Sequence, residues 1–292
     1  MSSNPLSQCA MLANLSVRCW GAARTDKKIS SEVAESHSVD AKRAGKYRKN
    51  AINVEAPTYE AVKAAATELR SKHYEYTLPW SQDGARILTT MMFEQYSREM
   101  RALRGKFDLA VQAFVEDYPT LKSAARIELN GMYNEGDYPT DIREKFGVEV
   151  AILPLPEAED FRVSLPETAV RQIRDDIQAE LDRAAHVAMQ DPYERLYSHI
   201  TRMVQRLSDP KGVFRDTLVS GLVDLCAILP GLNLTQDPRL DELRQRAEQM
   251  IVHVSAQELR DNPAVRRDVA RQAADIQNMM SGFMGVAASE AA

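Results

Sequence analysis

Residues 148–165 read VEVAILPLPEAEDFRVSL, a pattern that differs from that of nearly all the chain around them. Apolar residues alternate with smaller or polar ones in two runs: Val148, Val150 and Ile152, then Phe161, Val163 and Leu165. A period of two in a run rich in β-branched residues is typical of a strand, whereas apolar positions on a helix recur every three or four residues. The stretch therefore predicts strands at 148–153 and 160–165.

A further strand is predicted near the amino terminus, where residues 12–20 read LANLSVRCW. The alternating positions are Leu15, Val17 and Cys19 on one side and Ser16, Arg18 and Trp20 on the other. Its natural partner is the 148–165 stretch, because both have the strand period. This pairing would tie the amino terminus to the middle of the chain.

Most of the remaining sequence has the three- or four-residue apolar spacing that is typical of helices. Aromatic residues make up only 7% of the 292 residues, while alanine and other good helix formers are plentiful. We therefore expect a mainly α fold with a small β-sheet. Residues 1–165 would form an α+β domain that contains the sheet, and residues 166–292 a helical bundle or coiled-coil-like arm.

Prolines mark the expected helix boundaries. Pro57 is expected to begin a helix that ends near Ser71, and a long helix is expected over residues 85–117 because Tyr118-Pro119 follows it. Three later joints place an Asp or Asn before a proline: Asp191-Pro192, Asp237-Pro238 and Asn262-Pro263. The Asp or Asn can cap free backbone N–H groups, and proline suits the first helical position, so each joint predicts a boundary or a kink.

Charge is distributed unevenly along the chain. The net charge is -5, yet residues 1–56 hold nine basic and five acidic side chains, so this part is positive. Residues 24–50 are polar and allow one weak helical turn at best, and within them lies a basic segment: Lys42, Arg43, Lys46, Tyr47, Arg48 and Lys49. The segment suits either a solvated surface or an anion or nucleic-acid contact, in which the cations neutralise phosphates and Tyr47 stacks on a base.

Residues 77–84 read TLPWSQDG and combine proline, aspartate and glycine, which predicts a structured turn. Trp80 would either be buried as an anchor between helices, which we favour, or be exposed to a partner. Asp83 belongs to the same turn. Both residues are therefore candidate structural anchors or partner contacts.

The common signatures of catalysis and cofactor binding are missing from the sequence, including the glycine-rich phosphate loops and the zinc-protease motif. The three cysteines are far apart, which argues against a disulfide framework or zinc site and fits a reducing cytoplasm. The acidic corner at Glu157, Glu159 and Asp160 could gather a divalent cation, but such a cluster is more often a solvated loop. No apolar run approaches the roughly 20 residues that span a bilayer. We expect no catalytic residue, cofactor or metal, and no membrane association.

Several short words in this order resemble an uncharacterised family of phage and mobile-element proteins, a domain of unknown function. They are Asn14-Leu15-Ser16-Val17 with Trp20, Lys46-Tyr47-Arg48-Lys49, Thr77-Leu78-Pro79-Trp80 with Asp83-Gly84, Asp137-Tyr138-Pro139 with Phe146, and Asp160-Phe161-Arg162-Val163. Members of this family are often encoded near a MoxR-like AAA+ ATPase, and sometimes near recombination proteins. The resemblance implies a partner of that kind by association, and no catalytic residue.

The sequence and the resemblance together lead to two main functional hypotheses, beside a third, an enzyme of unrecognised type. The first is a non-enzymatic phage or mobile-element accessory protein in the cytoplasm of a bacterial host, which acts through protein–protein interaction with an AAA+ ATPase or with itself. Its helical arm would keep an apolar stripe exposed for that partner. The alternative is a nucleic-acid-binding accessory factor in recombination or replication that uses the basic segment, residues 42–49.

Overall fold

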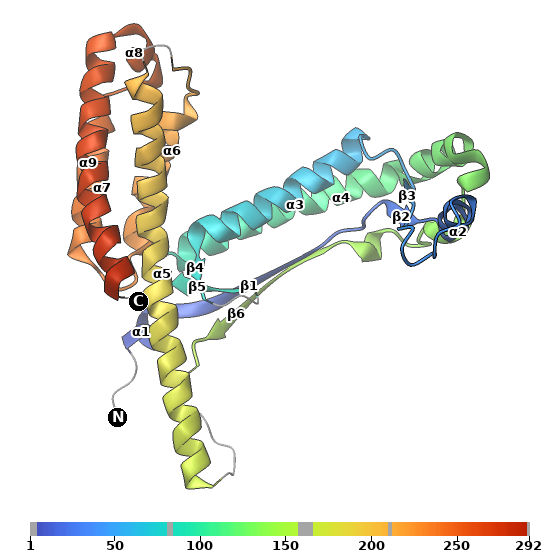
Figure 1. Ribbon diagram of the computed structural model, residues 1–292, viewed down its shortest axis with the longest axis horizontal. Helices are drawn as coiled ribbons and strands as arrows, with labels where there is room; N and C mark the ends of the chain where they lie inside the picture. Colours follow the sequence, from blue (N-terminus) through green and yellow to red (C-terminus); the bar gives the residue numbers. More distant parts are fainter. Residues whose placement is uncertain (1–4, 81–83, 157–165, 210–211, 291–292) are drawn as a thin grey trace. The chain divides into compact units, whose positions relative to one another are not determined.

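The computed structural model describes residues 5–80, 84–156, 166–209 and 212–290. Its described part is mainly α with small antiparallel sheets, so the predicted fold class is confirmed. The strands are β1 Ala10–Arg18, β2 Ala23–Thr25, β3 Arg48–Asn50, β4 Leu78–Pro79, β5 Ala85–Thr89 and β6 Gly147–Pro154. The helices are α1 Pro5–Cys9, α2 Lys27–Ser36, α3 Pro57–Tyr76, α4 Phe93–Leu129, α5 Glu167–Ser208, α6 Thr217–Leu232, α7 Pro238–Ile251, α8 Ala256–Asp261 and α9 Pro263–Glu290 (Figure 1). Short 3₁₀ helices lie at Asn130–Met132, Glu135–Asp137 and Arg143–Lys145.

The chain divides into two compact units that are assembled from separate stretches of sequence. Unit 1 comprises Met1–Asn14, Glu75–Tyr96 and Ala151–Ala292, and unit 2 comprises Leu15–Tyr74 and Ser97–Val150. The sequence predicts a domain boundary after residue 165, and this boundary stays a prediction.

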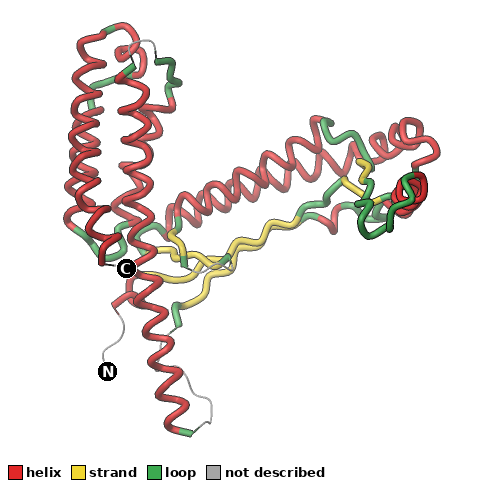
Figure 2. The backbone as a smooth tube through the Cα atoms, viewed as in Figure 1, coloured by secondary structure: helices red, strands yellow, loops and turns green. Residues whose placement is uncertain are grey.

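The larger sheet has the strand order β4-β5-β1-β6. The strands are drawn in yellow in Figure 2. Strand β1 runs antiparallel to β5, with Ala10 opposite Thr89 and Leu12 opposite Ile87. The predicted strands at 12–20 and 148–153 correspond to β1 and β6, and these two are neighbours in the sheet as expected. The strand predicted at 160–165 lies outside the described residues.

Residues 85–89 form strand β5, so the prediction that a helix begins at residue 85 is wrong. Helix α4 begins only at Phe93. Ile87, Leu88 and Thr89 are all buried, and the backbone of this segment pairs with both β1 and β4. The apolar spacing that begins at Ile87 suits a helix, but a short apolar run fits the strand period equally well. The hydrogen bonds to strands β1 and β4 therefore decide in favour of a strand.

Helix α4 continues through Pro119, so the predicted stop at Tyr118-Pro119 is also wrong. A proline inside a helix removes one backbone hydrogen bond and crowds the preceding turn. Burial on both sides of it offsets this cost, because Phe114, Tyr118 and Ala125 all face the interior. Ser123 also donates a hydrogen bond from Oγ to the Pro119 carbonyl, at 2.8 Å.

Helix α5 likewise runs unbroken through Pro192, where the sequence analysis expects a boundary or a kink. Pro192 is itself buried, between Ala188 and Leu196 on the same helix face. Arg195 fixes this part of α5 within unit 1, because its guanidinium donates to the carbonyls of Glu75 at 2.7 Å and Thr77 at 2.9 Å. The packing of the proline is therefore compatible with a helix that continues across it.

The core of unit 2 is an aromatic cluster of Trp20, Tyr59, Phe114, Tyr118 and Phe146. Trp20 meets Tyr59 and Tyr118 edge to face, with ring centroids 6.3 and 5.9 Å apart. The Tyr59 hydroxyl donates to the Trp20 carbonyl at 3.1 Å and accepts from the Ala22 N–H at 3.2 Å. These contacts fasten the chain just after β1 to helix α3, which is five residues longer than predicted and ends at Tyr76.

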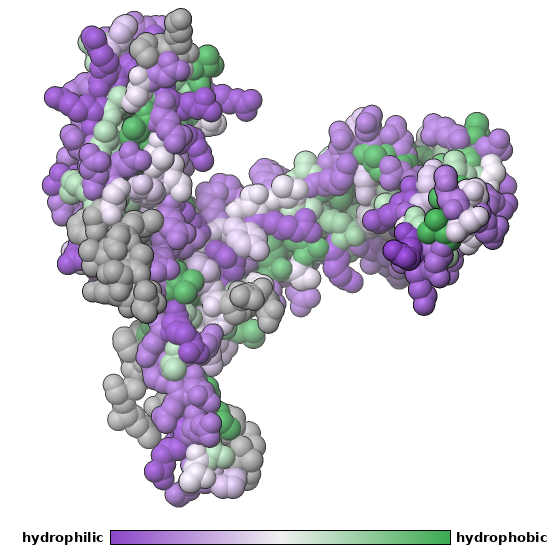
Figure 3. All heavy atoms as spheres, in the orientation of Figure 1, coloured by the Kyte–Doolittle hydropathy of each residue, from purple (hydrophilic) through white to green (hydrophobic). Residues whose placement is uncertain are grey.

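In unit 1, the second half of α5 packs with α6, α7, α8 and α9 as a helical bundle (Figure 1). Two predicted joints are confirmed as helix starts, since Asp237 caps α7 and the Asn262 side chain accepts from the first N–H groups of α9. The apolar stripes of these helices face one another in a shared core: Leu196, Ile200, Met203, Leu218, Leu222, Leu229, Leu240, Leu243, Val269 and Ile276 are all buried. On the face shown in Figure 3 the bundle surface is mostly hydrophilic. Within the described residues these stripes therefore pack against one another, whereas the sequence predicts an arm that keeps one exposed.

Candidate nucleic-acid interface

The basic segment lies in unit 2, where the chain returns from α2 into strand β3. Strand β3 pairs antiparallel with β2, which places Thr25 opposite Arg48 and Arg24 opposite Lys49. The Tyr47 backbone is held at both polar groups, because its N–H donates to Ser30 Oγ and its carbonyl accepts from the Asp26 N–H, both at 3.0 Å. These two hydrogen bonds attach the segment to the N-cap residue and to the first turn of α2.

The N-terminus of α2 explains why this helix forms although the sequence analysis expects only one weak turn. The Asp26 carboxylate caps α2 by accepting from the Ile29 N–H at 3.1 Å, and the Asp26 carbonyl accepts from Ser30. Such a cap satisfies backbone donors that otherwise have no partner. Helix α2 therefore extends over ten residues, and its first turn supports the basic segment.

Lys49 differs from the other cations of the segment because its side chain is buried. Lys49 Nζ lies 3.3 Å from Asp26 Oδ2 and 3.1 Å from Asp137 Oδ2, and it also donates to the Met132 carbonyl. A buried ammonium group requires such partners, because its loss of hydration is otherwise uncompensated. Lys49 is therefore a structural anchor, and the prediction that it contacts a nucleic acid is corrected.

Asp26 serves both the helix cap and this buried ion pair. The hydrogen bond from the Ile29 N–H, together with the Lys49 ammonium, lowers the pKa of the Asp26 carboxyl below its ordinary value. Asp26 and Asp137 are the residues that the sequence analysis missed. The position of Asp26 just before Lys27, at the start of α2, is the pattern of a helix cap that could have identified it.

The four remaining cations, Lys42, Arg43, Lys46 and Arg48, all have exposed side chains. Within the part of the chain that the structure describes, no carboxylate lies within ion-pairing distance of any of them. The alternation of strand residues accounts for Arg48, because Lys49 next to it points into the core. Lys27, the first residue of α2, is exposed beside them and adds a cation that the sequence analysis did not include.

Tyr47 is 42% exposed and stands among these cations. Its hydroxyl lies 3.9 Å from the Met132 sulfur. A hollow of about 410 Å³ adjoins the ring and is lined by Tyr47, Arg48, Lys49, Asn50, Ile52, Asn53, Val54, Glu55, Ala125, Glu128, Leu129 and Met132. The hollow combines an aromatic ring with amide and carboxylate groups, which are the groups that contact unpaired bases.

Trp80 and Asp83 are the two candidate residues that the sequence predicts in the turn at 77–84. Trp80 is half-buried directly after β4 and belongs to unit 1, whereas the basic segment belongs to unit 2. Asp83 lies outside the described residues. The roles of anchor or partner contact for these two residues stay predictions.

The described residues contain no group of three or more His, Cys, Asp or Glu side chains arranged to hold a metal ion. The acidic corner at 157–160 lies outside them. None of the helices in the described ranges has both the length and the apolar character needed to cross a bilayer.

Comparisons with known proteins give no relative of this chain: no family model, curated protein or solved structure matches it. The resemblance to the phage and mobile-element family therefore stays a prediction.

Proposed function

We propose that this protein is a non-enzymatic accessory factor of a phage or mobile element that binds nucleic acid through its basic segment. The observation that carries the proposal is the separation of roles within the segment. Lys49 is buried as an anchor, while Lys42, Arg43, Lys46 and Arg48 are exposed without a carboxylate partner in the described residues.

Such an arrangement favours a contact with phosphates. Two hydrogen bonds hold the Tyr47 backbone in place in the free protein. The backbone of the segment then does not have to become ordered on binding, which reduces the entropic cost of association. The rest of the chain is acidic overall, so a phosphate backbone would be attracted to this segment and repelled by most other surfaces. Tyr47 would stack on an unpaired base, which favours single-stranded over duplex nucleic acid.

The test is the salt dependence of binding to a fluorescent single-stranded oligonucleotide of about 20 nucleotides, followed by anisotropy. Four phosphate contacts give a slope of log K against log salt of about -3. The quadruple variant with Lys42→Gln, Arg43→Gln, Lys46→Gln and Arg48→Gln is expected to lose most of this slope and at least about tenfold in affinity at low salt.

The matched control removes four exposed cations elsewhere in unit 2: Arg98→Gln, Arg101→Gln, Arg104→Gln and Lys106→Gln. It changes the net charge equally, so it should weaken binding far less if the contact is local. A second pair of variants tests stacking on Tyr47. Tyr47→Phe keeps the aromatic ring and should keep the affinity, whereas Tyr47→Ala removes the ring and should lower the affinity about fivefold. Equal losses in the two quadruple variants, or no binding at low salt, would reject the proposal.

Protein–protein interaction is the second candidate, and one observation supports it. Strand β6 is the last strand of the sheet in the described residues, and it exposes Val150, Ile152 and Leu153. Exposed apolar residues on an end strand are typical of surfaces that accept a strand from another chain. We propose that a protein partner, either an AAA+ ATPase as the resemblance implies or a second copy of this chain, would dock there in the bacterial cytoplasm.

Light scattering over a range of concentrations, together with co-purification with a MoxR-like AAA+ ATPase, tests this second candidate. Ile152→Lys places a charge on the exposed side of β6 and is expected to abolish either association. A monodisperse monomer that retains no ATPase would argue against it, and this result would leave nucleic-acid binding unaffected.

A further inference from the structure

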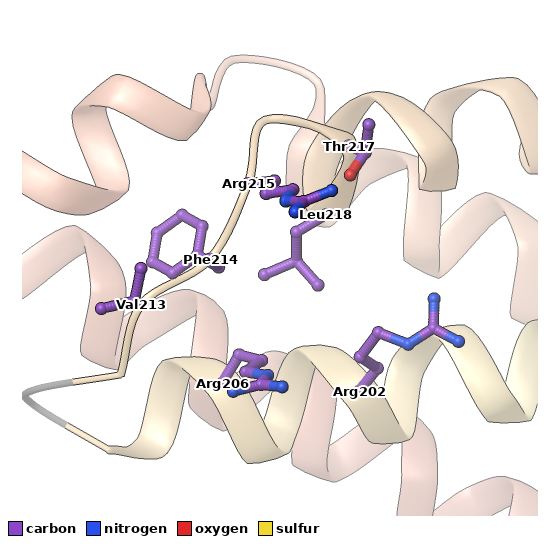
Figure 4. Close-up of a pocket in the computed structure, with 7 residues that line it drawn as sticks. All are labelled: Arg202, Arg206, Val213, Phe214, Arg215, Thr217 and Leu218. Atoms are coloured by element: carbon purple, nitrogen blue, oxygen red, sulfur yellow. The ribbon is translucent and has the colours of Figure 1, made fainter. Parts of the chain in front are cut away.

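An arginine-lined hollow of about 320 Å³ lies within unit 1, between the last turns of α5 and the first turn of α6 (Figure 4). It is called the arginine pocket here, and its lining residues are Arg202, Arg206, Val213, Phe214, Arg215, Thr217 and Leu218. Neither the basic segment nor strand β6 contributes to it. Its charge therefore needs its own explanation.

The three arginines of the pocket come from two sides. Arg202 and Arg206 are four residues apart on α5 and so lie on one helix face, while Arg215 comes from the connection that leads into α6 (Figure 4). Among the residues that the structure describes, no carboxylate pairs with any of the three. Like charges at this spacing repel one another, so the free pocket is electrostatically unfavourable.

Two other arginines nearby show the opposite behaviour, because their donors are occupied within the fold. Arg266 donates to the carbonyls of Leu207, Arg206, Asp209 and Gly212, and thereby caps the carboxyl-terminal end of α5. Arg260 donates to the Phe214 carbonyl at 3.2 Å and to Asp216 Oδ1 at 2.5 Å. Arg266 and Arg260 thus bind carbonyls at the end of α5 and in the connection to α6.

The same two arginines make the wall of the pocket rigid. Phe214 is buried, and the guanidinium carbons of Arg260 and Arg266 lie 5.3 and 5.4 Å from its ring centroid. Each contact combines a cation–π interaction with hydrogen bonds to the neighbouring backbone. Arg215 follows Phe214 directly, so the connection that carries it is held in place in the free protein.

We propose that the arginine pocket binds the phosphoryl dianion of a small phosphorylated molecule. Planar guanidinium groups bind phosphate through paired N–H donors, and three of them on two sides of a hollow match an anion with several oxygens. The Thr217 hydroxyl, also in the lining, adds a further hydrogen-bonding group. A volume of about 320 Å³ is at the small end of ligand pockets, which fits a phosphoryl group with a limited organic part.

Calorimetric titration of the full chain with inorganic pyrophosphate tests the proposal. We expect saturable binding of one pyrophosphate per chain at moderate salt. The triple variant with Arg202→Gln, Arg206→Gln and Arg215→Gln should bind at least about tenfold more weakly. These side chains are exposed, so the variant should keep the circular dichroism spectrum and melting curve of the wild type.

The matched control carries Arg171→Gln, Arg174→Gln and Arg183→Gln, which remove three exposed cations from the first half of α5. It has the same net charge as the pocket variant and should bind pyrophosphate within about twofold of the wild type. Equal weakening in the two variants, or no saturation up to about 10 mM pyrophosphate, would overturn the proposal.

A competition experiment with an oligonucleotide distinguishes binding of a small ligand from binding of the phosphates of a nucleic acid. If the pocket serves a small molecule, a saturating single-stranded oligonucleotide leaves the pyrophosphate affinity unchanged. Competition between the two would assign the pocket to nucleic-acid phosphates and overturn the proposal as stated. The quadruple variant of the basic segment should still bind pyrophosphate, so failure of the proposed function and failure of this inference give different results.

Discussion

Lys49 Nζ lies 3.1 Å from Asp137 Oδ2, and this ion pair joins strand β3 to the 3₁₀ helix at Glu135–Asp137, 88 positions later in the chain. Both side chains are largely buried. The pair explains how a segment that is otherwise polar and exposed has a defined position in unit 2. It also divides the basic segment into one structural cation and four exposed ones.

Replacement of this anchor is expected to destabilise the protein. Lys49→Met keeps the length of the side chain but leaves the carboxylate of Asp137 without its cation, which should lower the free energy of unfolding by about 2 kcal/mol. Lys46→Met, at an exposed position, should change it by less than about 0.5 kcal/mol. Urea unfolding followed by circular dichroism measures both, and equal effects would show that Lys49 is not an anchor.

Asp26 should make the stability of the protein dependent on pH in the acid range. Its folded-state pKa is lowered by the Ile29 N–H and by Lys49, so its stabilising effect is complete above the unfolded-state value of about 4. The effect is lost as the pH falls through the lower folded-state pKa. Asp26→Asn retains a capping side chain but cannot ionise, so its urea midpoint should fall less steeply than that of the wild type below about pH 4.

Glu35→Gln provides the control for this experiment, because Glu35 is an exposed carboxylate on the same helix. It should keep the acid dependence of the wild type. If Asp26→Asn and the wild type lose stability in parallel between about pH 6 and pH 3, the link between the cap and the ion pair is refuted.

Two helical glycines should respond in opposite directions to alanine. A Cβ at Gly105, on the exposed side of α4, would have no neighbour within 4 Å, so Gly105→Ala should raise the free energy of unfolding by about 0.5–1 kcal/mol. A Cβ at Gly231 in α6 would overlap the sulfur of buried Met92, so Gly231→Ala should lower it by about 2 kcal/mol.

The two glycine variants are compared by thermal and urea unfolding under identical conditions. Stabilisation by both substitutions would mean that Met92 can move away at little cost. In that case the contact of α6 with the residues between β5 and α4 is not tightly packed.

Cysteine reactivity should report on the opening of the bundle. Cys226 in α6 is 3% exposed, and burial, with a contribution from Glu248, raises the pKa of its thiol to about 11. At pH 8 only about one thiol in a thousand is then ionised, and the reagent cannot reach it in the folded protein. Cys19, which is exposed, should be alkylated by iodoacetamide first, as measured by peptide mass spectrometry. Equal rates at Cys19 and Cys226 in the native protein would contradict the packing of α6.

The local patterns that predict the fold correctly are those in which one physical cause dominates. The period of two identifies β1 and β6, because their side chains alternate whatever surrounds them. The caps at Asp237 and Asn262 were predictable for a similar reason. The side chain, the backbone donors that it satisfies and the proline that follows are all adjacent in sequence.

The candidate site was only partly predictable. The sequence places five cations and Tyr47 within eight positions, but it does not distinguish Lys49 from Lys46. That distinction depends on strand alternation in β3 and on Asp137, which is far away in the chain. The arginine pocket was not predicted at all, since Arg202, Arg206 and Arg215 meet only when α6 packs against α5.

The sequence by itself determined the high helix content, the strand character of β1 and β6, and the capped starts of α7 and α9. These features follow from interactions between near neighbours in the chain. Only the tertiary structure decided that helices α4 and α5 continue through Pro119 and Pro192, that residues 85–89 form a strand, and that Lys49 is buried. In each of these cases burial and pairing with distant segments outweigh a local preference of a few kcal/mol at most. Such energies cannot be read from neighbours in sequence.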